Sequence, residues 1–119
     1  MKIAITSQGT SLDSEVDPRF GRARYILLVD SDTFDFEVID NKDNFNAFKG
    51  AGIQAAQLVS EKGAEVLLTG YCGPNAFKAM KAANIGVAND AAGTIRDAVK
   101  AYIGGKLPLA DAANTEGQW

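Results

Sequence analysis

The chain of 119 residues has an apolar content of 46% and a formal net charge of −3, with a pI of about 4.8. Its length fits one domain with a core of its own, and its acidic balance without a basic run argues against a nucleic-acid partner. The chain contains no histidine and one cysteine, which excludes Ser-His-Asp, Cys-His and His-ligated zinc mechanisms as well as an internal disulfide.

The N-terminal segment predicts a strand and then a long loop. Residues 2–7 alternate isoleucine with small side chains, as strands do, and show no signal-peptide pattern. No apolar run in the chain approaches the roughly 20 residues that a membrane span needs, so we expect a cytoplasmic protein with no membrane contact. Residues 8–21 lack helical periodicity, and an ordered loop of this length in a small domain is more often functional than not.

Charged and aromatic side chains gather at the end of this loop. Arginine side chains match the geometry of oxyanions, but these arginines could equally pair with acidic residues nearby. The arginines are Arg19, Arg22 and Arg24, and the acids are Asp13, Glu15 and Asp17. Phe20 lies among them and has two interpretations, as a cover over a ligand or as an anchor of the loop in the core.

A hairpin of two strands is predicted next. Residues 24–30 have a continuous apolar centre, and residues 34–40 alternate apolar with acidic side chains. The alternation predicts a strand near a sheet edge with one solvent-exposed face. We expect Phe34, Phe36 and Val38 to form its buried face.

The first helix is predicted over residues 50–62, after a glycine-rich start. Its buried stripe is expected to consist of Ile53, Ala56 and Val59, with Leu58 beside them, and Gly63 suits its end. Lys49 places a positive charge just before the start, either near a ligand or as an ordinary solvated lysine. The sequence Gly50-Ala51-Gly52 lacks the third glycine of a dinucleotide fingerprint, and the chain has no phosphate-loop Gly-Lys-Ser/Thr.

The stretch over residues 65–80 is the most informative part of the chain. Its short apolar run, Val66-Leu67-Leu68, is typical of a strand that is buried on both faces. Gly70 and Gly73 allow a tight loop, and Pro74 suits the first turn of a helix. A strand, loop and helix in this order place free N–H groups at the carboxyl edge of a sheet, which is a general anion site, although most such junctions bind nothing.

Cys72 lies in this loop beside Tyr71 and also has two interpretations. A lone cysteine is usually a small buried apolar residue. Alternatively, because a helix start lowers the pKa of a thiol and a thiolate suits copper, Cys72 is a candidate metal ligand.

In the C-terminal part, the sequence predicts a short strand over residues 85–88 and then a helix. Thr94 is expected to cap the start of this helix, and Gly104-Gly105 to end it. A flexible tail is expected over residues 106–119. The element order β-β-β-α-β-α-β-α predicts a single α/β domain over 1–105, with a mixed five-stranded sheet and three helices. Ligands bind such sheets at the carboxyl ends of the strands. The long loop, the glycine-rich helix start and the loop over 70–74 are expected to meet there.

Several stretches, taken in order over residues 1 to 107, resemble one known family. They are Lys2-Ile3-Ala4-Ile5, Asp17-Pro18-Arg19-Phe20-Gly21-Arg22-Ala23, Gly50-Ala51-Gly52-Ile53-Gln54-Ala55-Ala56, Leu68-Thr69-Gly70 with Gly73-Pro74-Asn75-Ala76-Phe77, Ala83-Asn84-Ile85-Gly86-Val87, and Gly93-Thr94 with Ala98, Tyr102, Gly105 and Leu107. On these motifs the chain resembles the dinitrogenase iron–molybdenum cofactor-binding family of NifX-like and NafY-like domains, and within it the small stand-alone members of the orange-protein type.

The resemblance implies a ribonuclease H-like three-layer fold and a function in binding or carriage rather than catalysis. The implied cargo is an anionic molybdenum-containing metal–sulfur cluster, either a molybdenum–copper sulfide or an iron–molybdenum–sulfur cluster, bound without covalent attachment and delivered to or received from a protein partner. Many relatives carry histidine where this chain has Phe48-Lys49, so charge, backbone N–H groups and apolar packing are expected to hold the cluster. The candidate site consists of Arg19, Phe20, Gly21, Arg22, Lys49, Gly50, Gly52, Gly70, Tyr71, Cys72, Gly73 and Pro74.

Two other functions remain open from the residues themselves. The same helix-start site would suit an enzyme or a binding domain for a small phosphorylated molecule, although the chain lacks histidine and a phosphate-loop lysine. The chain could also be a scaffold that makes its contacts through the tail from Lys106 onward.

Overall fold

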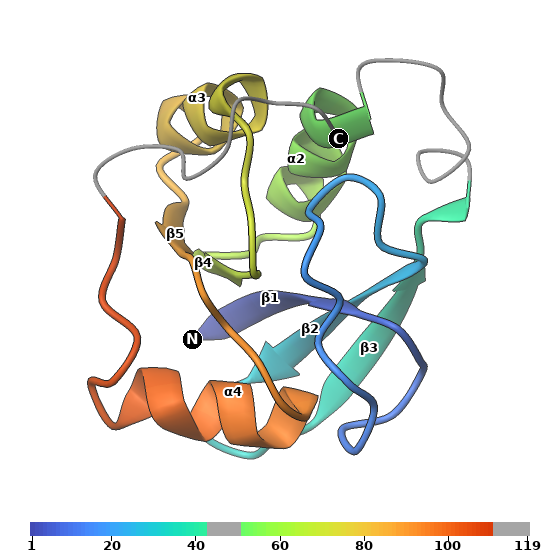
Figure 1. Ribbon diagram of the computed structural model, residues 1–119, viewed down its shortest axis with the longest axis vertical. Helices are drawn as coiled ribbons and strands as arrows, with labels where there is room; N and C mark the ends of the chain where they lie inside the picture. Colours follow the sequence, from blue (N-terminus) through green and yellow to red (C-terminus); the bar gives the residue numbers. More distant parts are fainter. Residues whose placement is uncertain (43–50, 111–119) are drawn as a thin grey trace.

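The structure, a computed structural model, describes residues 1–42 and 51–110. The sheet and helices follow the predicted order (Figure 1). The elements are β1 (Lys2–Ser7), β2 (Tyr25–Asp30), β3 (Phe36–Asp40), α2 (Ala51–Glu61), β4 (Val66–Leu68), α3 (Pro74–Ala82), β5 (Gly86–Ala88) and α4 (Ile95–Ile103). The predicted boundaries agree with these to within two residues.

The sheet has five strands in the order β3-β2-β1-β4-β5. β2 runs antiparallel to both of its neighbours, β1 and β3, whereas β4 and β5 run parallel to β1 and to each other. Ile5 at the centre of the sheet lies opposite Leu27 on one side and Leu68 on the other. The prediction of a mixed five-stranded α/β sheet is therefore confirmed.

Alternate residues of the central strands face two separate apolar layers, which makes the fold a three-layer one. Ala4 and Leu67 face the layer that α2 and α3 cover, whereas Ile3, Ile5 and Leu68 face the layer that α4 covers. Figure 1 shows α2 and α3 on one side of the sheet and α4 on the other. Strands buried on both faces need continuous apolar runs, which is why residues 66–68 carry no polar side chain.

The buried stripe of α2 differs from the predicted one. Ala55, Ala56 and Val59 are buried, but Ile53 is 41% exposed, so the prediction for Ile53 is wrong. The helix turns its Gly52 side toward α3, where a Cβ atom on Gly52 would lie 2.9 Å from the Cβ of Ala76. Since successive residues lie about 100° apart around a helix, this contact turns Ile53 away from the core.

The outer strand β3 also departs from its prediction. Phe36 and Val38 are 42% and 37% exposed, and Ile39 is the buried residue of the strand. Phe36 and Val38 pair with Val29 and Leu27, so they share the sheet face that α4 covers further along. α4 packs chiefly against β1, two strands away from β3, and the outer strand keeps its apolar side chains in solvent.

The segment after α4 runs back along the outer edge of β5. The N–H of Ala110 donates to the carbonyl of Val87 at 2.7 Å, and a Cβ on Gly86 would meet the end of the Leu109 side chain at 3.0 Å. Residues 111–119 of the predicted tail lie outside the described ranges. No helix in 1–42 or 51–110 is long and apolar enough to cross a bilayer.

Candidate functional site

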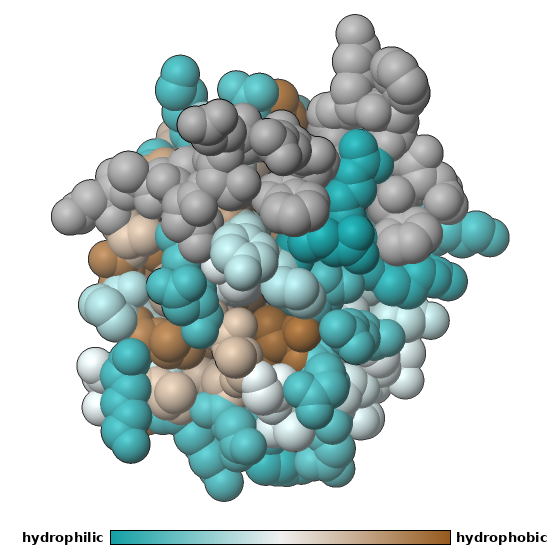
Figure 2. Space-filling model, in the orientation of Figure 1, coloured by the Kyte–Doolittle hydropathy of each residue, from teal (hydrophilic) through white to brown (hydrophobic). Residues whose placement is uncertain are grey.

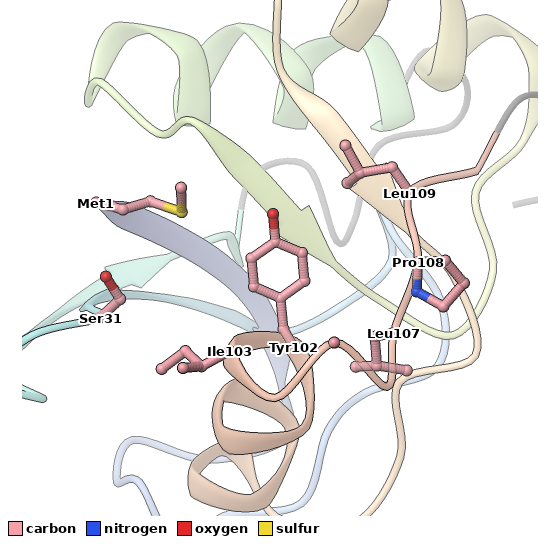
Figure 3. A pocket seen from close by; sticks show the side chains of 8 residues that line it. Met1, Ser31, Tyr102, Ile103, Leu107, Pro108 and Leu109 are labelled. Carbon is pink, nitrogen blue, oxygen red and sulfur yellow. The ribbon is translucent and has the colours of Figure 1, made fainter.

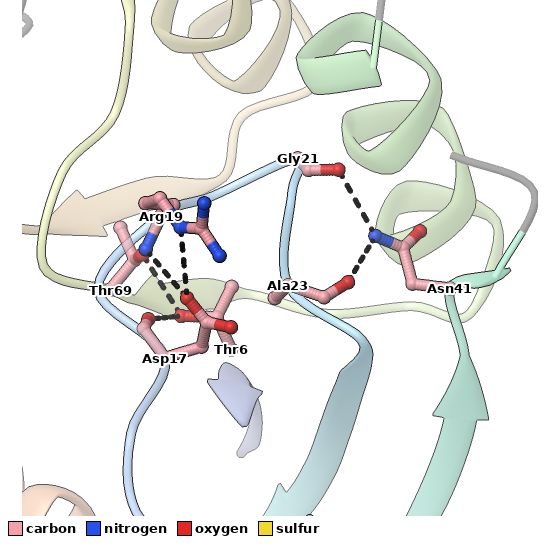
Figure 4. Close-up of polar contacts among 7 residues, drawn as sticks. All are labelled: Thr6, Asp17, Arg19, Gly21, Ala23, Asn41 and Thr69. Carbon is pink, nitrogen blue, oxygen red and sulfur yellow. Dashed lines mark hydrogen bonds and ion pairs between the residues drawn. The ribbon is translucent and has the colours of Figure 1, made fainter. Parts of the chain in front are cut away.

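Two buried hydroxyls mark the carboxyl edge of the central strands. Thr6 and Thr69 are fully buried, and their hydroxyls are hydrogen-bonded at 2.9 Å. The Thr6 hydroxyl also donates to the carbonyl of Asp17 at 2.6 Å (Figure 4). This contact fixes the end of the long loop to the sheet, because a buried hydroxyl left without partners would destabilise the fold.

The long loop then pairs with the loop that follows β4. Tyr71 donates its N–H to the carbonyl of Pro18 at 2.6 Å, and Phe20 donates its N–H to the carbonyl of Tyr71 at 3.1 Å. Arg19 and Tyr71 thereby form a parallel bridge, and a Cβ on Gly70 would lie only 2.7 Å from the Cα of Pro18. Glycine is needed at position 70 because the two backbones approach so closely. The structure thus brings together two of the three predicted loops.

The arginines of the loop have different partners. The Nε atom of Arg19 lies 3.8 Å from the nearly buried carboxylate of Asp17, and the Arg19 side chain remains 43% exposed. Arg24 pairs with Asp40 instead of the acids of the loop, and the ion pair holds the pKa of the Asp40 carboxyl below its usual value. Arg22 is half-buried. Pairing with the loop acids is therefore confirmed for Arg19 and wrong for Arg24.

Asp13, another of the loop acids, contacts a different element. Its carboxylate lies 3.5 Å from Arg96 on α4. The same end of α4 donates two backbone N–H groups to the loop, from Ile95 to Ser14 at 2.9 Å and from Arg96 to Leu12 at 2.9 Å. The N-terminus of α4 is thus occupied by protein groups.

Two buried side chains, Phe20 and Asn41, hold the end of the long loop against the core. Phe20 is 1% exposed and packs in the core under α2 and α3, as its interpretation as an anchor predicts. Asn41, which is 1% exposed, donates its side-chain N–H groups to the carbonyls of Gly21 at 3.3 Å and Ala23 at 2.9 Å (Figure 4). Sequence reasoning missed Asn41, since nothing in its local sequence separates it from the other asparagines that follow β3.

Two helix starts converge beside this loop. The close approach of Gly52 to Ala76 joins the first turns of α2 and α3, and both helices begin at the same end of the molecule (Figure 1). Gly73 at the N-cap of α3 offers no side-chain hydrogen bond, and neither helix has an acidic residue in its first turn. Helix starts without acidic residues attract anions through their N–H groups and dipoles. Lys49 and Gly50, which belong to the same predicted site, lie outside the described residues.

Cys72 does not have the environment that its position suggested. The side chain is fully buried in the core under α2 and α3, with its sulfur 3.8 Å from the carbonyl oxygen of Gly73. Burial raises the pKa of the Cys72 thiol to about 12, so the expected lowering of this pKa is wrong. The role of Cys72 as a metal ligand stays a prediction, and it would require the side chain to leave the core.

The raised pKa predicts how stability depends on pH. An unfolded thiol ionises near pH 9, but the folded Cys72 keeps its proton up to about pH 12. The folded state therefore loses stability relative to the unfolded state as pH rises above 9, by about 1.4 kcal/mol at pH 10. Urea unfolding at pH 8 and pH 10 should show this loss in the natural chain and not in Cys72→Ala. An equal pH dependence in the two proteins would contradict the buried, protonated thiol.

The remaining residues of the predicted site lie at its rim. Tyr71 is 43% exposed beside Arg19, Pro74 is exposed, and Gly73 is buried. Among the described residues, no group of three or more histidine, cysteine, aspartate or glutamate side chains could hold a metal ion. The site therefore offers positive charge, an aromatic hydroxyl and backbone N–H groups, which suit an anion that brings its own metal ligands.

A separate groove of about 490 Å³ lies around the C-terminal end of α4 (Figure 3). Its lining includes Met1, Tyr102, Ile103 and Leu109 and carries no charged side chain. Figure 2 shows apolar side chains that reach the surface among hydrophilic ones on this face of the molecule. An apolar groove lined in this way is a poor match for an anion, so the carboxyl edge remains the candidate site.

Comparison with protein families gives one match. Residues 1–105 match the model of the dinitrogenase iron–molybdenum cofactor family. A comparison with curated proteins finds no match to the chain.

Solved structures agree with the family match. The chain is similar to the apo form of the orange protein from Desulfovibrio gigas, with 46% identity, 96% of each chain covered and a TM-score of 0.94. It is also similar to a protein from Thermotoga described as of NifB type, with 34% identity, 98% of each chain covered and a TM-score of 0.83. Both similarities extend over nearly the whole chain, so they include every element that positions the site.

Proposed function

Because this chain belongs to the dinitrogenase iron–molybdenum cofactor family, we propose that it binds and carries an anionic molybdenum-containing metal–sulfur cluster and catalyses no reaction itself. The observation that carries the proposal is the meeting of two helix starts, neither with an acidic residue in its first turn, with the Arg19–Tyr71 bridge at one edge of the sheet. This arrangement supplies hydrogen-bond donors and positive charge, which a polyanion needs, without a general base.

The cluster is proposed to bind without a bond from protein to metal. In a molybdenum–copper sulfide cluster, sulfides would serve as the metal ligands and would accept hydrogen bonds from backbone N–H groups and from arginine. We propose that Arg19, Arg22 and Lys49 neutralise its charge, while backbone N–H groups in the first turn of α3, which begins at Pro74, donate hydrogen bonds to it. A cluster held in this way can leave intact, which suits transfer between this chain and a protein partner.

The decisive experiment is metal analysis with a visible absorption spectrum, on protein purified anaerobically from its native host. Molybdenum with sulfide and copper, together with a charge-transfer band, would support a molybdenum–copper sulfide cluster, whereas iron in place of copper would support an iron–molybdenum cluster. Colourless protein that also refuses added tetrathiomolybdate with Cu(I) would overturn the proposal. Turnover of a phosphorylated substrate by such metal-free protein would favour the enzyme alternative.

Removal of the two loop arginines tests how much their positive charge contributes to cluster binding. Arg19→Ala with Arg22→Ala is expected to weaken cluster binding at least tenfold, because a charge-assisted hydrogen bond is worth about 1.5–3 kcal/mol. The dependence of the affinity on salt should also become flatter, since fewer ionic contacts remain to be screened. Titration with tetrathiomolybdate and Cu(I) at two salt concentrations measures both effects.

Arg96→Ala is the control, because it removes one positive charge from α4, away from the site. Its affinity and its salt dependence should equal those of the natural chain. If the double variant bound the cluster as tightly as this control, Arg19 and Arg22 would have no part in the site.

A further inference from the structure

The outer edge of β3 has no strand beside it in the part of the chain that the structure describes. β3 is the last strand of the sheet on its side and pairs with β2 (Figure 1). Beyond this pairing, no described segment forms a backbone hydrogen bond with residues 36–39. An unpaired strand edge is a template on which a further strand can form.

The register of β2 and β3 shows which backbone groups point outward. In an antiparallel ladder, every second pair of residues exchanges hydrogen bonds. The N–H of Asn41, just after β3, donates to the carbonyl of Arg24 at 3.0 Å, so every second residue before Asn41 also bonds to β2. The residues between them, Phe36 and Val38, therefore point their N–H and C=O groups away from the sheet.

The side chains of the same two residues are exposed. Phe36 and Val38 are 42% and 37% exposed, although they pair with Val29 and Leu27, which lie in the core under α4. Single exposed apolar side chains are ordinary, but two of them on an unpaired edge favour association with another chain. A strand from a partner would bond to the outward backbone groups and cover both side chains.

The charge of this hairpin selects the partner. Residues 30–40 contain five acidic residues and no lysine or arginine. A second copy of the chain would bring these acids against the same acids, which is unfavourable across paired strands. A segment that carries lysine or arginine is attracted instead, so the charge favours a basic partner over self-association.

A hollow of about 200 Å³ beside β3 offers a place for a basic side chain. Its lining includes three acidic residues, Asp30, Asp35 and Glu37, and one basic residue, Lys2. Glu37 also pairs with Lys62 at 3.0 Å, so Asp30 and Asp35 supply the remaining negative charge. Backbone N–H groups of the following turn hold the pKa of the Asp30 carboxyl below its usual value, which keeps it ionised.

We infer that the outer edge of β3 is a docking site for a partner protein that adds an extended segment of alternating apolar and basic residues to the sheet. The apolar side chains of that segment cover Phe36 and Val38, and its basic side chains face the acids of the hairpin. Asn41, which follows β3, bonds to Gly21 and Ala23, so the partner lies beside the loop of the proposed cluster site. The docking itself needs no cluster and goes beyond the proposed function.

Two synthetic peptides test the inference on the metal-free protein. One alternates valine with lysine, and the other alternates valine with glutamate. The lysine peptide is expected to bind at least about tenfold more tightly, because only its charge complements the hairpin. Amide hydrogen exchange followed by NMR locates the binding: Phe36 and Val38 should exchange faster than Glu37 and Ile39 in the free protein and become protected by the lysine peptide.

Val38→Pro removes an N–H that points outward, and proline is tolerated at such positions of edge strands. The lysine peptide should bind Val38→Pro at least about tenfold more weakly than Val38→Thr, the matched control, which keeps the N–H. Both variants should bind the cluster formed from tetrathiomolybdate and Cu(I) as the natural chain does.

If Val38→Pro folds poorly, Asp35→Lys provides a second test, because it reverses an exposed charge beside the hollow and should weaken binding of the lysine peptide. Glu61→Lys, the same change at an exposed position of α2, is its control. Equal binding of the two peptides, or protection outside β3, would overturn the inference. Dimerisation of the natural chain that Val38→Pro abolishes would assign the edge to a second copy instead. A natural chain that binds no cluster would overturn the proposed function and leave this inference standing.

Discussion

Gly70→Ala is expected to lower the free energy of unfolding by about 3 kcal/mol and to weaken cluster binding. The added Cβ would lie 2.7 Å from the Cα and 2.8 Å from the carbonyl oxygen of Pro18, so one of the two backbones has to move. That movement would break the hydrogen bonds by which Tyr71 joins the long loop. Urea unfolding measures the loss of stability, and titration with tetrathiomolybdate and Cu(I) measures the loss of affinity.

Gly86→Ala is the matched control. Gly86 is the first residue of the parallel strand β5, and its added Cβ would meet only the flexible end of the Leu109 side chain at 3.0 Å. We expect it to lower the free energy of unfolding by less than about 1 kcal/mol. Equal losses in the two variants would show that contact with the Pro18 backbone is not what makes glycine necessary at position 70.

Asn41→Ala is expected to lower the free energy of unfolding by about 3 kcal/mol. The substitution leaves the carbonyls of Gly21 and Ala23 without the donors they now have, and it opens a cavity at a position that is 1% exposed. Because Asn41 holds the segment next to Phe20 and Arg22, cluster affinity should fall along with stability. Thermal and urea unfolding of the metal-free protein give the first quantity.

Asn75→Ala is the control for stability, because Asn75 is exposed on α3. This substitution should change the free energy of unfolding by no more than about 0.5 kcal/mol. Crystals of Asn41→Ala should show the loop displaced around Gly21. A variant as stable as the natural chain, with the loop in place, would show that water replaces the amide donors without loss.

Local signals in the sequence were sufficient for most of the fold. The short apolar run over 66–68, Pro74 at a helix start and the Thr94 cap, which accepts the N–H of Asp97 at 3.1 Å, depend on residues close in the chain. The errors occurred where a distant element decides exposure. Ile53 is exposed because of the contact between α2 and α3, and Phe36 and Val38 are exposed because α4 packs chiefly against β1, two strands away from β3.

The candidate site was predictable as a set of loops but not in its details. Its glycines and Pro74 were visible in the sequence, and the structure joins the two loops that carry Arg19 and Tyr71. Asn41 was missed because its importance comes from carbonyls far away in sequence. The expected pKa of Cys72 was wrong because position at a helix start does not reveal whether a side chain points to the dipole or into the core.

The place of β1 in the sheet has a consequence for synthesis of the chain. β1 pairs with β2, and β2 pairs with β3. A three-stranded antiparallel meander can therefore form once residues up to Asp40 have left the ribosome. The other edge of β1 pairs with residues 66–68, which are made later, after a delay of a few seconds at about 5–20 residues per second. During that interval the nascent chain presents the open edge and apolar faces of β1, which makes this the stage of synthesis with the greatest tendency to aggregate.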